Sequence, residues 1–170
     1  FTKGKSIFDS YCSTCHGPKG LGSPTGNGQL IAPAFSGSQR IQGHPEYAVK
    51  TMLRGLKGDL EGKEYEGVMI AMDMNDDEYI ASVISYIRNE FGNNASFVSP
   101  EYVAEIRAET KERKRNYSFD ELIQEVPKAL TLQDNWKVTA SSTALQGVGS
   151  TKDPSYAFGF KGWKAEEAQK

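Results

Sequence analysis

Both cysteines of the chain and one of its two histidines lie within one short segment, YCSTCHG, at residues 11–17. Cys12, Cys15 and His16 are residue types that carry out thiol redox chemistry, bind zinc or attach a haem group covalently. A redox dithiol is typical of a βαβ context. A zinc site needs four ligands, and beyond Cys12, Cys15 and His16 the chain has no other cysteine and only one other histidine, His44. The spacing therefore favours covalent haem attachment, with a dithiol or a metal site as open alternatives.

The geometry of a helical turn explains why this spacing suits haem. The thiols of Cys12 and Cys15 project to the same side, where they can form thioethers with both vinyl groups of one porphyrin. His16 then lies next to the iron and can serve as its proximal ligand. The expected cofactor is one covalently bound haem c. His44 is expected to be a helix-start or surface residue.

Composition limits the class of protein. A chain of 170 residues suits one domain with an appendage, and its formal net charge of -2 gives no reason to expect a nucleic-acid partner. No stretch of the sequence approaches the roughly 18 apolar residues that a transmembrane helix requires. We therefore expect a soluble protein that binds neither nucleic acid nor spans a bilayer.

The elements that must hold the motif are predicted to be helices and one long loop. Apolar spacing predicts a first helix over residues 3–15, followed by a glycine-rich loop over 17–43 that a flat apolar cofactor could pack. Pro45 predicts the start of a second helix that ends near Gly58. The clearest helix is predicted from Asp77 to Phe91, capped by Asn75 or Asp76 and stopped at Gly92.

The composition changes beyond this helix. Ser99 and Pro100 predict a charged helix to about Lys114, in which Glu109 could pair with Arg113. Ser118 and Glu121 form a predicted capping box for a further short helix that Pro127 closes. From Lys128 the chain is rich in Ser, Thr, Gly and Lys with scattered aromatic residues, and we interpret residues 128–170 as an irregular tail that could bind a partner.

Three runs in this order resemble a class I c-type cytochrome: GKSIFDSYCSTCHG, APAFSGS and GVMIAMDMNDDEYIASVISYIRNEFGN. The resemblance implies an all-α fold, a small helical bundle around one covalent haem, in which Gly4, Phe8 and Tyr86 match the crossing of the first and last helices. The resemblance covers a cytochrome c domain at residues 1–95, and the composition beyond it predicts a helical extension at 96–127 and the irregular tail at 128–170.

The resemblance also implies the remaining haem contacts. The distal iron ligand of the family is usually a methionine on the loop before the last helix, and Met69 matches that position better than Met72 or Met74, although Ile70 stands where many relatives have proline. Pro33 resembles the residue whose carbonyl accepts a hydrogen bond from the proximal histidine. Tyr65 resembles a tyrosine that lines the distal side, and Arg54 is a candidate for a propionate contact. Ordinary packing is the alternative for Tyr65, Met72 and Met74, and a solvated helix face for Arg54.

Within the family, GHPEYAVKTMLRGLKG and VSPEYVAEIRAET resemble modules that accompany or are fused to periplasmic quinoprotein-type sugar and alcohol dehydrogenases. This implies an electron-transfer protein and not an enzyme, with His16 and Met69 on the iron. It would pass electrons between a dehydrogenase or quinol-oxidising complex and a downstream acceptor, in the periplasm or another extracytoplasmic compartment of a bacterium. The alternatives are a haem-based sensor or enzyme with an open sixth site, and a relay subunit anchored in a larger complex by its tail.

Overall fold

The computed structural model describes residues 1–130, and regular structure in this part of the chain is helical. Extended backbone pairs there only in isolated β-bridges, so the expected all-α fold class is confirmed. The predicted irregular tail and its suggested partner-binding role lie outside the described residues, apart from residues 128–130. No helix between residues 1 and 130 is long and apolar enough to cross a bilayer.

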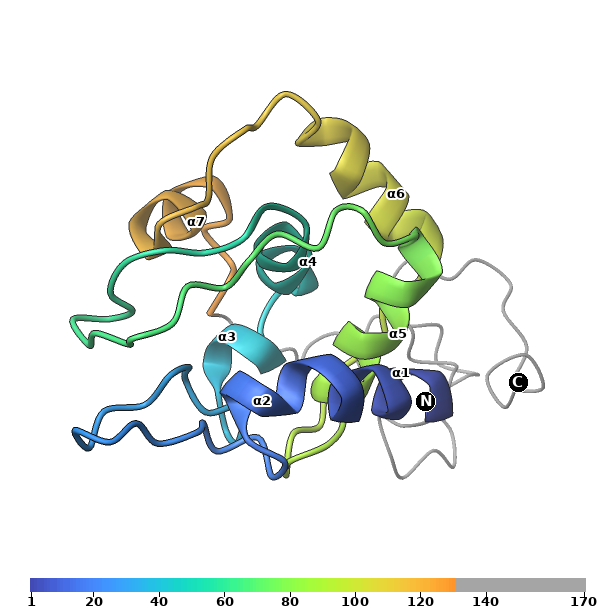
Figure 1. Cartoon of the computed structure of the whole chain (residues 1–170). Coiled ribbons are helices and arrows are strands. Elements are labelled where there is room, and N and C mark those ends of the chain that lie inside the picture. Colours follow the sequence, from blue (N-terminus) through green and yellow to red (C-terminus); the bar gives the residue numbers. More distant parts are fainter. Residues whose placement is uncertain (131–170) are drawn as a thin grey trace.

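The N-terminal helical run positions the CxxCH motif. Helix α1 (Thr2–Ile7), a π-helical turn (Phe8–Cys12) and α2 (Ser13–His16) follow one another without interruption, as the sequence predicted for residues 3–15. Gly4 lets α1 approach α5, since a Cβ there would lie 2.1 Å from the carbonyl oxygen of Ser82. The run therefore rests directly on α5 (Figure 1).

Aromatic rings fill the junction between these helices. The ring of Phe8, which is fully buried, lies 5.7 Å from that of Tyr86, 4.9 Å from that of Phe91 and 6.1 Å from that of Phe35. Gly4, Phe8 and Tyr86 therefore meet where the resemblance placed them. Pairs at these separations add to the stabilisation that burial alone provides.

Helix α4 (Pro45–Arg54) begins at Pro45 as predicted, and the imidazole of His44 caps it by accepting a hydrogen bond from the Glu46 amide at 3.4 Å. The expected end near Gly58 is wrong, because the helix stops at Arg54 and Gly55 takes a positive φ of 76°. Leu56 then leaves the helix and pairs with Met69 in an antiparallel bridge. A short helix before it, α3 (Gln39–Gln42), lies in the segment that the sequence predicted as loop.

Helix α5 (Asp77–Ile87) begins as predicted, with the Asp76 carboxylate accepting a hydrogen bond from the Tyr79 amide at 2.7 Å. It ends four residues before the expected Phe91. The last turn tightens there, because the Asn89 amide donates to the Tyr86 carbonyl at 3.0 Å, and Phe91 adopts a left-handed φ of 58°. This reversal turns the Phe91 ring towards Phe8.

The extension at residues 96–127 contains α6 (Pro100–Glu109) and α7 (Phe119–Glu125), and the capping box of Ser118 and Glu121 is confirmed. Both helices bury apolar side chains against the first 95 residues. Val103 and Ile106 of α6 join the core formed by α1, α4 and α5, and Leu122 of α7 joins a second cluster with Tyr47 and Leu56. The extension thus shares both apolar clusters with the cytochrome-like part of the chain.

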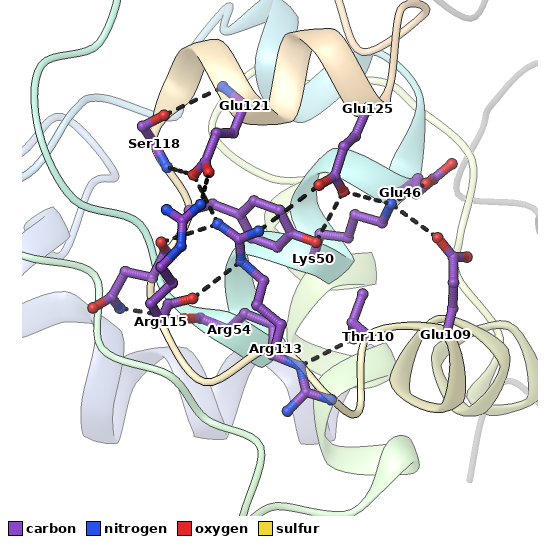
Figure 2. A network of polar contacts seen from close by, with 12 residues as sticks. Glu46, Lys50, Arg54, Glu109, Thr110, Arg113, Arg115, Ser118, Glu121 and Glu125 are labelled. Atoms are coloured by element: carbon purple, nitrogen blue, oxygen red, sulfur yellow. Dashed lines mark hydrogen bonds and ion pairs between the residues drawn. The ribbon is translucent and has the colours of Figure 1, made fainter.

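Ion pairs also attach the extension to α4. Lys50 of α4, with a side chain only 3% exposed, lies 2.8 Å from Glu46, 3.1 Å from Glu109 of α6 and 3.2 Å from Glu125 of α7 (Figure 2). Burial alone would lower the pKa of Lys50, but these three carboxylates outweigh it and raise the pKa, so the ammonium stays charged. The expected pair between Glu109 and Arg113 is wrong, because α6 ends at Glu109 and Arg113 binds Glu121 at 2.7 Å.

Candidate haem site

The proximal side of the site is formed by α2 and the loop that follows it. Cys12, Cys15 and His16 line one cavity, and the carbonyl oxygen of Pro33 accepts a hydrogen bond from Nδ1 of His16 at 3.2 Å. The imidazole also stacks on Phe35, with ring centroids 4.1 Å apart and an interplanar angle of 19°. Because Nδ1 is engaged, Nε2 is the nitrogen left to bind a metal, and the orientation of the ring is fixed.

The electrostatics of the three motif residues suit haem attachment better than thiol redox chemistry. Burial, outweighing the hydrogen bond to Pro33, lowers the pKa of His16 to about 4, so the imidazole is neutral, the form that binds a metal. Burial, helped by Cys15, raises the pKa of Cys12 to about 11, whereas a catalytic dithiol needs a thiol whose pKa is lowered by a nearby positive charge.

The zinc alternative also lacks ligands. Among residues 1–130, no group of three or more cysteine, histidine, aspartate or glutamate side chains could hold a metal ion. His44 does not line the cavity and serves as the cap of α4, which confirms the expectation of a helix-start residue.

Backbone hydrogen bonds hold the proximal loop against the motif. The Gly22 amide donates to the His16 carbonyl at 2.8 Å, the Ser23 amide to Cys15 at 3.0 Å and the Phe35 amide to Gly20 at 2.7 Å. Gly22 has a φ of 83°, and a Cβ there would lie 2.6 Å from the carbonyl oxygen of Ala32. The loop expected to pack on a cofactor is therefore folded back onto α2.

The distal side of the cavity is formed by the segment between α4 and α5. Tyr65, Met69 and Met72 line the cavity, whereas Met74 does not and is 95% exposed. Two backbone hydrogen bonds join Met69 to Leu56, at 2.9 and 3.0 Å. This segment and the proximal loop extend from the helices to the same side of the molecule (Figure 1).

Arg54 does not lie where the resemblance suggested. Its guanidinium donates to Thr110 Oγ1 at 3.0 Å and to the Arg107 carbonyl at 3.1 Å, and it lies 3.3 Å from the Asp73 carboxylate. It is not among the residues that line the cavity. The expected propionate contact of Arg54 is corrected accordingly. Two other arginines line the described cavity: Arg40, which pairs with Glu61, and the fully buried Arg88.

Sequence reasoning missed a group of polar residues in the cavity. Within residues 1–130, three buried side-chain hydroxyls have no hydrogen-bond partner, those of Ser38, Tyr47 and Thr51, and all three residues line the cavity. Tyr47 and Thr51 are four residues apart on α4 and so share one face, a pattern visible in the sequence. Ser38 gives no such signal.

These hydroxyls test whether a haem fits the cavity, whose volume is about 330 Å³. Its lining is mostly apolar, including Ile31, Leu56, Leu60 and Val68. Buried polar atoms without partners are costly, so a ligand with an apolar body and polar groups would satisfy both parts of the lining. A porphyrin with its two carboxylates has this composition, and the residues fit it.

Comparison with known proteins agrees with the site. The sequence model of the cytochrome c family matches residues 1–90, and the chain belongs to this family. It is accordingly a class I monohaem electron-transfer protein that binds haem c covalently, and Cys12, Cys15 and His16 fit the attachment motif.

The chain is also similar to two individual cytochromes. Cytochrome c-552 of Thermus thermophilus is 33% identical over 92 residues, which are 53% of this chain and 69% of the relative. The fructose dehydrogenase cytochrome subunit of Gluconobacter japonicus is 28% identical over 118 residues, which are 65% of this chain and 23% of that relative. The second match extends past the family region and so includes residues of the extension or the tail.

Proposed function

We propose that His16 and Met69 are the two axial ligands of the haem iron, and that the protein passes single electrons between a dehydrogenase or quinol-oxidising complex and a downstream acceptor. The observation that carries the proposal is the pairing of an oriented, neutral imidazole with a methionine on one mainly apolar cavity. When bound, haem c supplies the one-electron redox chemistry.

The chain's own residues set the conditions for that chemistry. The Pro33 carbonyl orients the His16 ring and makes the imidazole more basic. A methionine sulfur as the other ligand favours a high reduction potential and leaves no open position for a substrate. Met69 is favoured over Met72 because it matches the position of the family's distal methionine, and hydrogen bonds to Leu56 on both its amide and its carbonyl fix its backbone.

The polar groups of the cavity would receive the haem carboxylates. Burial raises the pKa of Tyr47, so its phenol keeps its proton and can donate a hydrogen bond. Ser38 and Thr51 add two hydroxyl donors, and Arg40 adds a positive charge. Together these four residues take the role that the sequence had suggested for Arg54.

Electron exchange requires a surface on which a partner can dock close to the cavity. Tyr11, Val68 and Ile70 both line the cavity and are largely exposed, at 67%, 48% and 70%. Such a small apolar surface suits weak, transient docking. The similarity to a dehydrogenase cytochrome subunit supports a dehydrogenase as the electron donor, and covalent haem attachment supports an extracytoplasmic location.

The test is the visible absorption spectrum of the holoprotein, oxidised and reduced, repeated under carbon monoxide. We expect a sharp reduced c-type spectrum that carbon monoxide leaves unchanged, and a ferric far-red band from methionine sulfur. A reduced spectrum that shifts under carbon monoxide would contradict the proposal and support a sensor or enzyme with an open sixth site.

A further inference from the structure

The extension at residues 96–127 contacts the distal segment between α4 and α5, which carries Met69. Neither the haem chemistry nor the cytochrome c fold explains this feature. Arg107 of α6 holds the short stretch between Met72 and α5. It lies 2.7 Å from the Asp77 carboxylate and donates to the carbonyls of Asp73 at 2.6 Å and Asn75 at 2.7 Å. One side chain of the extension thus makes two hydrogen bonds with this stretch and one with the first residue of α5, each from a charged donor.

Arg54 adds a second connection from the end of α4. Its side chain is 9% exposed and joins Thr110 and the Arg107 carbonyl of α6 to the Asp73 carboxylate. The backbone carbonyl of Arg54 in turn accepts a hydrogen bond from Asn116 at 3.2 Å. The end of α4, the end of α6 and the distal segment are therefore bound to one another.

A third connection runs through the backbone to Met69 itself. The Tyr117 amide donates to the Gly55 carbonyl at 3.0 Å, and the Lys57 amide donates to the Tyr117 carbonyl at 2.9 Å. The backbone of Leu56, which lies between Gly55 and Lys57, exchanges two hydrogen bonds with Met69 on the side away from Tyr117. Tyr117, Leu56 and Met69 thus lie side by side, with Leu56 in the middle.

The extension is itself anchored to α4. Lys50 binds Glu109 of α6 and Glu125 of α7, while the Arg113 guanidinium lies 3.5 Å from the centre of the Tyr117 ring and pairs with Glu121 (Figure 2). Tyr117 is therefore held from the α7 side, and its phenol donates to Glu125 at 3.0 Å. These contacts make the extension a fixed support against which the distal segment rests.

We propose that the extension restrains the Met69 segment, and that Arg107 and Tyr117 are positioning residues for the sixth ligand. Opening of this segment is what would detach a methionine from the iron, so the extension limits how often the ligand leaves. This inference rests on the proposed role of Met69, but the restraint on the backbone can be measured independently of ligation.

The experiment compares Arg107→Ala with the unaltered holoprotein by two measurements. Amide hydrogen exchange reports opening of the Leu56 and Met69 amides, and the rate of carbon monoxide binding to the reduced protein reports how often the sixth site opens. Because three charge-assisted hydrogen bonds are lost, we expect both rates to rise by about tenfold or more. The ferric far-red band should also disappear at a lower temperature than in the unaltered protein.

Two control variants separate positioning from general destabilisation. Arg115→Ala removes an exposed arginine of the extension that pairs with Glu121 and should leave both rates unchanged. Val103→Ala weakens the buried packing of α6 without removing any of these contacts. It should lower the unfolding temperature, and the ferric far-red band should stay unchanged at temperatures below unfolding. If Arg107→Ala fails to fold, Arg107→Lys, which keeps the charge but not the planar fork, should give the same direction of change.

The outcomes are distinct. Rates in the Arg107 variant equal to those in Arg115→Ala would overturn the inference. Retention of the far-red band in Met69→Leu would overturn the proposed ligand instead, and the amide exchange of Leu56 and Met69 would still decide whether the extension restrains the segment.

Discussion

The two sides of the haem site are held in place differently. On the proximal side, the hydrogen bonds that orient His16 and hold the start of its loop against α2 join residues between Cys15 and Phe35, close together in the sequence. Distant residues hold only the later part of this loop: Asn93 donates to the Phe35 carbonyl at 3.0 Å, and the Gly67 amide donates to the Ile31 carbonyl at 2.9 Å. On the distal side, Met69 rests on Leu56, and Leu56 rests on Tyr117 of the extension. We therefore expect loss of contacts with the extension to increase opening of the distal side more than opening of the proximal side.

The largest loss of stability is expected at the crossing of α1 and α5, on which both sides of the haem site rest. Gly4→Ala places a Cβ 2.1 Å from the Ser82 carbonyl oxygen and forces α1 away from α5, so we expect a loss of more than about 3 kcal/mol in the free energy of unfolding. Denaturant unfolding of the holoprotein measures it. The control is Gly26→Ala, where the added Cβ meets nothing within 4 Å and the change should stay within about 0.5 kcal/mol. Equal stabilities of the two variants would contradict the close approach of α1 to α5 at Gly4.

The next effect tests whether the extension belongs to the same cooperative unit. Leu122 of α7 is fully buried, so Leu122→Ala should cost about 3 kcal/mol and lower a single unfolding transition that haem absorbance and circular dichroism report together. Gln124→Ala on the exposed face of α7 is the control and should be close to neutral. A separate early transition that leaves the haem spectrum intact would show that the extension does not support the distal side.

A change at Gly55 should affect the distal side selectively. A Cβ there would lie 2.6 Å from the Met69 carbonyl oxygen, and φ is 76°, so we expect Gly55→Ala to cost about 2 kcal/mol and to weaken the far-red band. Gly28→Ala has a similar φ of 86° but open space around it, so it should cost only about 1 kcal/mol and leave the band unchanged. Thermal melts followed at the far-red band compare them, and equal behaviour would argue against close packing at Gly55.

The smallest effect is a pH dependence within the extension. A hydrogen bond from the Ser118 backbone, aided by Arg115 and Arg113, lowers the pKa of Glu121 from 4.5 to about 2. The folded protein therefore binds a proton at Glu121 less readily than the unfolded chain does. The contribution of the charged Glu121 to the free energy of unfolding is complete above pH 4.5 and is lost as the pH falls towards 2. Unfolding free energies of the unaltered protein and Glu121→Gln should converge over this interval, and a constant difference between them would contradict the role of Glu121.

The sequence predicted what short-range chemistry determines. The CxxCH motif, the caps at His44, Asp76 and Ser118, and the helix start at Pro45 depend on neighbouring residues, and each lies where it was expected. Of the cavity residues that the resemblance named, Pro33, Tyr65 and Met69 do line the cavity.

The errors fall where distant contacts decide. Helix α4 ends at Arg54 and not near Gly58, because its C-cap Gly55 is the position at which Met69 and Asn116 approach the backbone closely. The sequence made Arg54 a candidate for a propionate contact. It gave no sign that Thr110 and the Arg107 carbonyl, more than fifty residues later in the chain, bind its guanidinium. The unpartnered hydroxyl of Ser38 becomes visible only when the loop is folded against α4.

The central claim, that Met69 is the sixth ligand on a distal side held by the extension, is tested most directly by proton NMR of the reduced holoprotein. The ring current of a porphyrin shifts the methyl signal of a ligating methionine strongly upfield. Met69→Leu and Met72→Leu nearly preserve side-chain volume and remove the thioether that could bind iron. We predict one upfield methyl signal that is absent in Met69→Leu and retained in Met72→Leu. Its persistence in Met69→Leu, or its loss in Met72→Leu alone, would contradict the account.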